Sequence, residues 1–275
     1  MQKIKATAKK NYQVRKLYHN LKYTKALLTV FKKNRQLKSQ VSLKLPPERL
    51  IYLVAGTPDA TWFYESGKQT ANSIIMNLNR NNLEFSMFRT VLDFGCGCGR
   101  VVRHLQEKST AVFYGTDYNK KLSGWCTKNL PGYYTTNGPT PPLQYSDGLF
   151  DFVYAWSVFT HFTEENHLLW LNELYRVLKP NGFLWFSYSG INFVQQLAEK
   201  EQQLFGENQI IVYDSSRCGS NWCCSYYSDE YLKKLVSKTS FRLVDLVPNS
   251  KKGEQSFCLL QKAPCGEILN QALSR

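Results

Sequence analysis

Residues 91–100, with the sequence VLDFGCGCGR, combine an apolar run, the carboxylate of Asp93 and three alternating glycines. Glycine adopts positive φ and lets a ligand approach the backbone, so this pattern predicts a strand, a tight turn and a helix around a bound molecule. The dinucleotide fingerprint G-x-G-x-x-G would need a third glycine where Arg100 stands. A phosphate-binding P-loop would need Lys followed by Ser or Thr after the glycines. The spacing therefore indicates a ligand of another kind.

Two other polar side chains stand where chemistry is expected. Asp117 ends the apolar run 112–117, and a carboxylate at a strand end can accept hydrogen bonds from both hydroxyls of a ribose. His161 follows the run 150–156, at the carboxyl end of a predicted strand, where open α/β sheets bind their ligands. With an ordinary pKa near ~6.5, its imidazole could accept a hydroxyl proton. The alternative is a structural histidine, hydrogen-bonded at the start of a helix over 164–178.

Four motifs follow one another within residues 50–262. They are D-x-G-x-G-x-G at 93–99, the acid Asp117, FDFVYAWSVFTH at 150–161 and LYRVLKPNG at 174–182. Their order and content resemble the class I S-adenosylmethionine (SAM) dependent methyltransferases, in particular the bacterial enzymes that act on small molecules and glycans. The resemblance implies SAM as the cofactor and requires no metal.

The resemblance also implies a role for each residue of the cofactor site. Asp93 would orient the loop and the methionyl ammonium, and Asp117 would take the ribose; for both carboxylates the alternative is a turn cap. The remaining positions fall into three groups: backbone groups for the methionyl end at Gly95, Cys96 and Gly97; neighbours of the adenine at Tyr118, Asn137 and Gly138; and neighbours of the sulfonium at Ser157 and Val158.

Strands and helices alternate along the part of the chain that carries these motifs. Strands are expected at 90–94, 111–116, 133–136, 151–156, 183–188, 241–247 and 255–260, and helices at 99–108, 119–129, 164–178, 191–205 and 228–238. Alternation of this kind predicts an α/β, Rossmann-like fold whose parallel sheet is covered on both faces. The last two strands are joined by six residues, too few for a crossover helix, so they must pair antiparallel. We expect a seven-stranded, mostly parallel sheet with an antiparallel last strand and a helical N-terminal cap.

The domain organisation predicted from composition has four parts: a basic helical arm at 1–45, a helical cap or lid at 46–88, the methyltransferase core at 89–262 and a tail at 263–275. Pro46 and Pro47 end the arm, because proline breaks a helix. The aromatic residues of 48–70 would fold over the cofactor as a lid, pack the cap onto the sheet, or do both.

The arm holds the whole charge excess of the protein. Of 35 Lys and Arg residues, 13 lie in residues 1–45, where there is no acid, and the rest of the chain has 22 bases against 21 acids. An apolar stripe recurs there at helical spacing: Val14, Leu17, Tyr18, Leu21, Leu28 and Phe31. The stripe could pack on the body, lie on an anionic membrane or meet an acidic partner. Nucleic acid is the least favoured partner, since only the arm's charge supports it.

The cysteines and the hydropathy pattern give a second set of expectations. The eight cysteines lack the spacing of a disulfide framework, and Cys218, Cys223 and Cys224 lack that of a metal site. No apolar run is long enough to span a bilayer, so we expect a cytoplasmic protein, with the option of peripheral attachment to a membrane.

The amino-acid sequence of the loop after the fourth strand excludes two classes of nucleic-acid methyltransferase. Adenine-N6 enzymes place Asn/Asp-Pro-Pro-aromatic there, and cytosine-C5 enzymes place Pro-Cys, whereas this chain has Trp156 to Phe159. Residues 157–161 and the aromatic cap at 48–70 resemble those of the bacterial small-molecule and glycan methyltransferases, and this resemblance implies O-methylation of a small-molecule or glycan hydroxyl. The alternative is a methyltransferase-fold protein that acts on or binds nucleic acid or a membrane surface through its arm.

Overall fold

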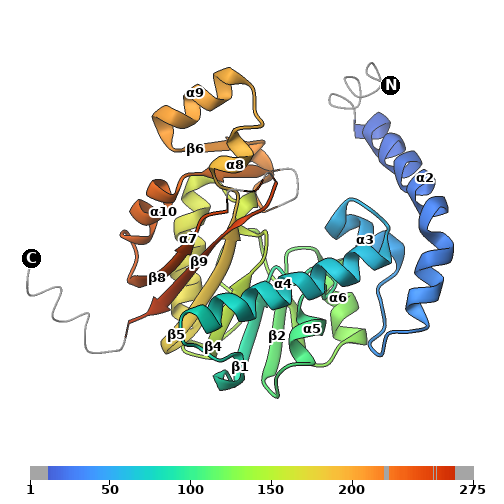
Figure 1. The fold of residues 1–275 in the computed structure, drawn as a ribbon, viewed down its shortest axis with the longest axis horizontal. Coiled ribbons are helices and arrows are strands. Elements are labelled where there is room, and N and C mark those ends of the chain that lie inside the picture. The colour runs from blue at the N-terminus through green and yellow to red at the C-terminus, as the bar shows by residue number, and fades with distance from the viewer. Residues whose placement is uncertain (1–11, 220–222, 250, 252, 264–275) are drawn as a thin grey trace, which may run out of the picture.

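The protein is built around a seven-stranded sheet with the strand order β3-β2-β1-β4-β5-β9-β8 (Figure 1). The computed structural model describes residues 12–219, 223–249, 251 and 253–263. The strands of this sheet are β1 (Thr90–Phe94), β2 (Val112–Asp117), β3 (Tyr133–Thr136), β4 (Phe150–Ala155), β5 (Leu178–Tyr188), β8 (Phe241–Val247) and β9 (Ser256–Lys262). β9 pairs antiparallel with both β5 and β8, whereas the pairs among β1 to β5 are parallel. The predicted seven-stranded sheet with its antiparallel last strand is confirmed, and that strand, β9, lies between β5 and β8.

Helices cover both faces of the sheet, as the alternating pattern predicts. They include α4 (Ala60–Arg80), α5 (Val102–Gln106) and α6 (Lys120–Asn129) on one face, and α7 (Glu164–Val177) and α10 (Asp229–Val236) on the other. Consecutive strand residues divide between the two hydrophobic clusters: Val91 packs with the first set of helices and Leu92 with the second.

Helix starts follow the local sequence. Thr163 accepts a hydrogen bond from the Asn166 amide at the start of α7, and Asp59 accepts from the amides of Thr61 and Trp62 at the start of α4. α5 begins later than the predicted residue 99, because Gly99 has a φ of +76°, which no right-handed helix accommodates.

The region after β5 departs from the sequence prediction. The single helix expected at 191–205 is two helices, α8 (Ile191–Val194) and α9 (Glu199–Asn208). The stretch that follows, expected to be irregular, contains a small antiparallel hairpin of β6 (Ile210–Tyr213) and β7 (Cys224–Tyr227).

The cap consists of α3 (Glu48–Ala55) and α4. Ile51 and Phe63 are fully buried in the core, so the packing role predicted for this region is real. Trp62, by contrast, is 47% exposed, and both it and Tyr52 face the cavity described below.

The arm forms the long helix α2 (Tyr12–Lys38), which lies on the outside of the molecule beside α3 (Figure 1). It docks through Tyr23, whose ring meets that of Tyr52 edge-on, and through the fully buried Asn34. Leu21, Leu28 and Phe31 are 63%, 77% and 57% exposed. The prediction that the apolar stripe packs on the body is therefore wrong for these three residues, because α2 contacts the body through its opposite side. Val14, Leu17 and Tyr18 are not among the residues whose side chains the structure describes.

Two further findings hold for the described part of the chain. It contains no helix long and apolar enough to cross a bilayer. It also contains no group of three or more His, Cys, Asp or Glu side chains able to hold a metal ion.

Candidate cofactor and acceptor site

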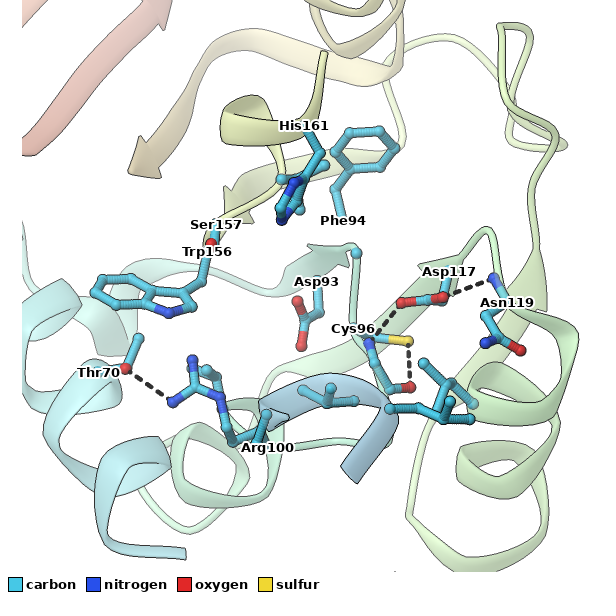
Figure 2. Close-up of a pocket in the computed structure, with 18 of the residues that line it drawn as sticks. Thr70, Asp93, Phe94, Cys96, Arg100, Asp117, Asn119, Trp156, Ser157 and His161 are labelled. Carbon is cyan, nitrogen blue, oxygen red and sulfur yellow. Dashed lines mark hydrogen bonds between the residues drawn. The ribbon is translucent and has the colours of Figure 1, made fainter. Parts of the chain in front are cut away.

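All eleven residues predicted for the site line one cavity of about 1250 Å³. It lies at the carboxyl ends of β1, β2 and β4, where parallel sheets of this kind bind ligands (Figure 2). Its walls include Asp93, Gly95, Cys96, Gly97, Asp117, Tyr118, Asn137, Gly138, Ser157, Val158 and His161. The cap closes part of it, with Tyr52, Val54, Trp62, Ser66 and Thr70 among the lining residues.

The glycine loop needs glycine for two separate reasons. Gly95 has a φ of +82°, and a Cβ at this position would lie 2.2 Å from Cγ2 of Val158. Gly97 has a φ of +55°, and a Cβ there would lie 3.1 Å from Cγ2 of Val54 in α3. Strand β1, the β4 loop and the cap thus approach one another at this loop, which leaves no room for side chains.

The loop's amide groups are already used within the protein. The amides of Gly95 and Cys96 donate to the Thr116 carbonyl at 2.8 and 2.9 Å, and the Gly97 amide donates to Oδ2 of Asp117 at 2.8 Å. These three amides are therefore not free to donate to a methionyl group. The backbone groups that the loop can still offer are its carbonyl oxygens, which can accept hydrogen bonds from an ammonium.

Asp117 acts as a turn cap in this structure. Besides Gly97, it accepts from the Asn119 amide at 2.7 Å (Figure 2). A carboxylate has about four acceptor positions, so two remain for ligand hydroxyls. Tyr118 is half exposed beside it, and Oδ1 of Asn137 accepts from the Thr116 hydroxyl at 2.9 Å. These side chains form one end of the cavity.

Asp93 and Arg100 place opposite charges at the centre of the cavity. Asp93 is 3% exposed, and burial raises the pKa of its carboxyl to about 7, while the nearby Arg100 opposes that rise. Arg100 is 8% exposed, and burial lowers its pKa to about 10. Its Nη1 donates to the hydroxyls of Ser66 and Thr70 in α4, at 3.3 and 3.2 Å. Figure 2 shows Asp93 between Arg100 on one side and Asp117 on the other.

Sequence reasoning missed Arg100 as a site residue and used it only to exclude a dinucleotide fingerprint. A signal was present: Arg100 lies at the amino end of a helix, where the macrodipole disfavours a cation. Among the residues that the structure describes, no carboxylate lies within ion-pair distance of its guanidinium.

An aromatic wall borders the other end of the cavity. The rings of Trp156 and Trp185 are nearly parallel with centroids 6.1 Å apart, and Phe257 packs 5.9 Å from Trp156. Ser157 stands beside this wall with a φ of +59°, unusual for a residue other than glycine. Its hydroxyl accepts from Nε2 of Gln255 at 2.9 Å, so the β8–β9 connection, which the sequence did not implicate, also shapes the site.

His161 lies in η2 (Phe159–His161), directly after the β4 loop. Its Nδ1 is 2.6 Å from the carbonyl oxygen of Cys223, at the start of β7. A carbonyl only accepts, so Nδ1 carries the proton and Nε2 carries the lone pair. Burial lowers the pKa of the imidazole, which favours the neutral form. The alternative predicted from the sequence, a histidine hydrogen-bonded at the start of the helix after it, is therefore wrong about the hydrogen-bond partner. Thr163 caps α7, and His161 bonds to the hairpin instead.

Comparison with known proteins agrees with this geometry. Residues 92–186 match the family model of a methyltransferase domain. Magnesium protoporphyrin IX methyltransferase from Synechocystis, solved with bound SAM, superposes with a TM-score of 0.51 at 14% identity, over 81% of this chain and 100% of that one. The 1,6-didemethyltoxoflavin-N1-methyltransferase of Burkholderia thailandensis, solved with 1,6-didemethyltoxoflavin and S-adenosylhomocysteine, gives 0.51 at 15% identity, over 74% and 81%.

The family match assigns residues 92–186 to a methyltransferase domain, and the sheet order and the glycine loop around it are those of the class I SAM-dependent fold. The expected enzyme class and cofactor are thereby confirmed. What the two neighbours methylate differs between them, so the acceptor of this enzyme has to be argued from its own cavity.

Proposed function

We propose that the cavity holds SAM with its adenosine at the Asp117–Asn137 end and its amino-acid end between Asp93 and Arg100. The fit rests on two features. The glycine loop packs so closely against Val158 and Val54 that only glycine fits, and two buried groups of opposite charge, Asp93 and Arg100, form no ion pair with each other. Bound there, SAM supplies an electrophilic methyl group. The protein's own part is to align, to exclude water and to manage a proton.

Asp93 and Arg100 suit the two charged groups of an α-amino acid. The Asp93 carboxylate and the loop carbonyls accept from an ammonium, while the Arg100 guanidinium donates to a carboxylate. Ser66 and Thr70 hold the guanidinium by hydrogen bonds, so the cap helix α4 takes part in cofactor binding by positioning Arg100.

The acceptor we propose is a hydroxyl on a ring-shaped small molecule or a glycan residue. Trp156 and Phe257 offer flat apolar surface for such a ring, and Gln255 and Ser157 offer hydrogen bonds next to it. His161 carries the proposal, because a neutral imidazole with a lone pair at Nε2 can take the hydroxyl proton as the oxygen is methylated. Nitrogen acceptors that are already nucleophilic have less need of such a base.

The test is a ligand screen followed by detection of product. Candidate phenols, sugars and sugar nucleotides are ranked by thermal shift in the presence of S-adenosylhomocysteine, and each hit is incubated with SAM and analysed by mass spectrometry. We expect a mass gain of one methylene on oxygen, formed far more slowly by a His161→Ala enzyme. Methylation at nitrogen or carbon that persists in this variant would contradict the proposal.

A further inference from the structure

The face of α2 turned away from the body carries three exposed apolar side chains among three cations. We call the set Leu21, Lys25, Leu28, Phe31, Lys32 and Arg35 the outer face. All six are exposed, and their spacings of three and four residues place them on one side of a helix. The opposite side contains Tyr23, Asn34 and Leu37, which are buried or half-buried against the body.

The cations of the outer face are distinct from those that dock the helix. Lys38 pairs with Glu48 at 2.6 Å, and Lys33 lies 3.7 Å from Asp59, so these two lysines are neutralised by the body. Lys25, Lys32 and Arg35 form no ion pair with any residue in the described ranges. The outer face therefore presents unneutralised positive charge around an apolar ridge.

We infer that the outer face docks on an anionic lipid bilayer, with the apolar ridge in the headgroup boundary and the cations on lipid phosphates. This combination of exposed leucine and phenylalanine with flanking lysine and arginine is the pattern of helices that lie in a membrane interface. Docking there requires no membrane-spanning segment. It is independent of the proposed acceptor, because attachment is measured without turnover.

Charge complementarity selects this occupant over three others. A second copy would bring the same cations face to face, and residues 1–11 contain four lysines and no acid, so neither neutralises the outer face. Nucleic acid offers phosphates but no apolar phase for Leu21, Leu28 and Phe31. A bilayer with anionic lipids offers both.

Docking would also bring the site to the membrane. Lys22, next to Leu21 on α2, and Arg49 of α3 both line the cavity, and Arg49 bridges the two helices through Oδ1 of Asn20 and the ring of Tyr23. Helix α2 thus carries the docked face and also contributes to the cavity wall. An acceptor displayed at the lipid headgroups would reach the enzyme by diffusion in two dimensions.

The experiment compares full-length protein with vesicles of phosphatidylcholine alone and with 30% phosphatidylglycerol, by co-sedimentation at about 50 and 500 mM salt. We expect binding to the anionic vesicles at low salt and loss at high salt, because screening lengths shorten several-fold over this range. Lys25→Glu/Lys32→Glu/Arg35→Glu and Leu21→Ser/Leu28→Ser/Phe31→Ser should each weaken binding at least tenfold.

Matched controls separate the outer face from general charge and hydrophobicity. Lys233→Glu/Lys234→Glu/Lys238→Glu makes the same charge change at exposed positions of α10 and after it, and Met76→Ser/Met87→Ser/Val112→Ser removes exposed apolar groups elsewhere. Both should bind like the parent. Unchanged thermal melting would show that every variant is folded.

Three results would overturn the inference. Equal binding to neutral and anionic vesicles, or none to either, excludes an anionic bilayer. Binding of a DNA or RNA duplex that survives the serine substitutions would make nucleic acid the partner. Self-association in sedimentation velocity that only the outer-face variants abolish would make the outer face a dimer interface.

Discussion

Asp93 and Arg100 show how much of this site is decided by single side chains held out of water. Each is nearly inaccessible and lines the cavity, and burial shifts the pKa of each toward its neutral form. Neither forms an ion pair with a described residue. Buried charges that lack partners destabilise a fold unless a ligand supplies them. In the binding mode proposed above, the amino-acid end of SAM supplies a partner for each of them.

Replacing Arg100 by Gln tests the carboxylate side of that site. S-adenosylhomocysteine should bind about 1.5–3 kcal/mol more weakly, or roughly 10- to 150-fold in Kd, since a hydrogen bond to a charged group is lost. 5′-Methylthioadenosine, which lacks the amino-acid end, should bind as before. Calorimetry with both ligands makes the comparison. If cofactor affinity were unchanged and the KM of the acceptor rose instead, the guanidinium would serve an acid group on the acceptor.

Asp93 should couple cofactor binding to pH. With a pKa raised to about 7, its carboxyl is half protonated at neutral pH in the free enzyme, whereas binding of an ammonium requires the ionised form. Affinity for S-adenosylhomocysteine should therefore rise from pH 5.5 to 7, with release of a fraction of a proton. Calorimetry in two buffers of different protonation enthalpy measures that release, which Asp93→Asn should abolish.

His161 should control turnover far more than cofactor affinity. His161→Ala is expected to lower kcat by ~10²-fold or more if the imidazole is the general base. Because burial lowers its pKa below the ordinary value, activity should increase with pH through the acidic range and level off by about neutrality. The pH profile of kcat checks this. Near-normal turnover in the variant would leave His161 as a link between η2 and the hairpin.

At the scale of elements, the site is made where β1, the β4 loop and the cap meet at the glycine loop. Gly95 has a positive φ, and the Val158 side chain lies where a Cβ of residue 95 would be, so the packing of these elements itself requires glycine. The glycine therefore both shapes the turn and keeps the pocket open.

Gly95→Ala should abolish S-adenosylhomocysteine binding and lower the melting temperature, because a methyl group meets Cγ2 of Val158 in a backbone conformation that alanine resists. Adding Val158→Ala should restore stability in part, since it relieves the clash but not the φ. Gly124→Ala in α6 is the control: a Cβ there meets nothing within 4 Å, and helix propensity favours alanine. Normal cofactor binding by Gly95→Ala would place the pocket elsewhere.

At the scale of the whole molecule, Asn34 joins the arm to the rest of the protein. Its Nδ2 donates to the Pro58 carbonyl at 2.9 Å, and its Oδ1 accepts from the Ala60 amide at 2.9 Å, both buried. The arm thereby holds the turn that starts α4, the helix that positions Arg100.

Asn34→Ala should destabilise the protein by about 1–3 kcal/mol for each backbone group left unpaired. Urea denaturation measures the loss, and Asn20→Ala, at a more exposed position on the same helix, should change stability by less than about 0.5 kcal/mol. Equal stability of the two variants would mean that α2 does not dock through Asn34.

The sequence by itself determined the sheet, the order of its elements along the chain and eleven of the residues that line the cavity. These depend on short-range patterns: apolar runs for strands, glycines where φ must be positive, and Asp117 at a strand's end. Parallel pairing then brings those strand ends to one edge, so residues predicted separately necessarily share a cavity.

Only the tertiary structure decided which groups complete the site and which face of the arm packs. Arg100 meets Thr70 across 30 residues, His161 meets Cys223 across 62, and Ser157 meets Gln255 across 98. The stripe of Leu21, Leu28 and Phe31 looked like a packing face, yet the buried anchor of α2 is the polar Asn34, because two backbone groups of the cap needed a partner. Helical periodicity predicts which residues lie on the same side of a helix. It does not predict what packs against that side, because the packing partners come from segments far away in the sequence.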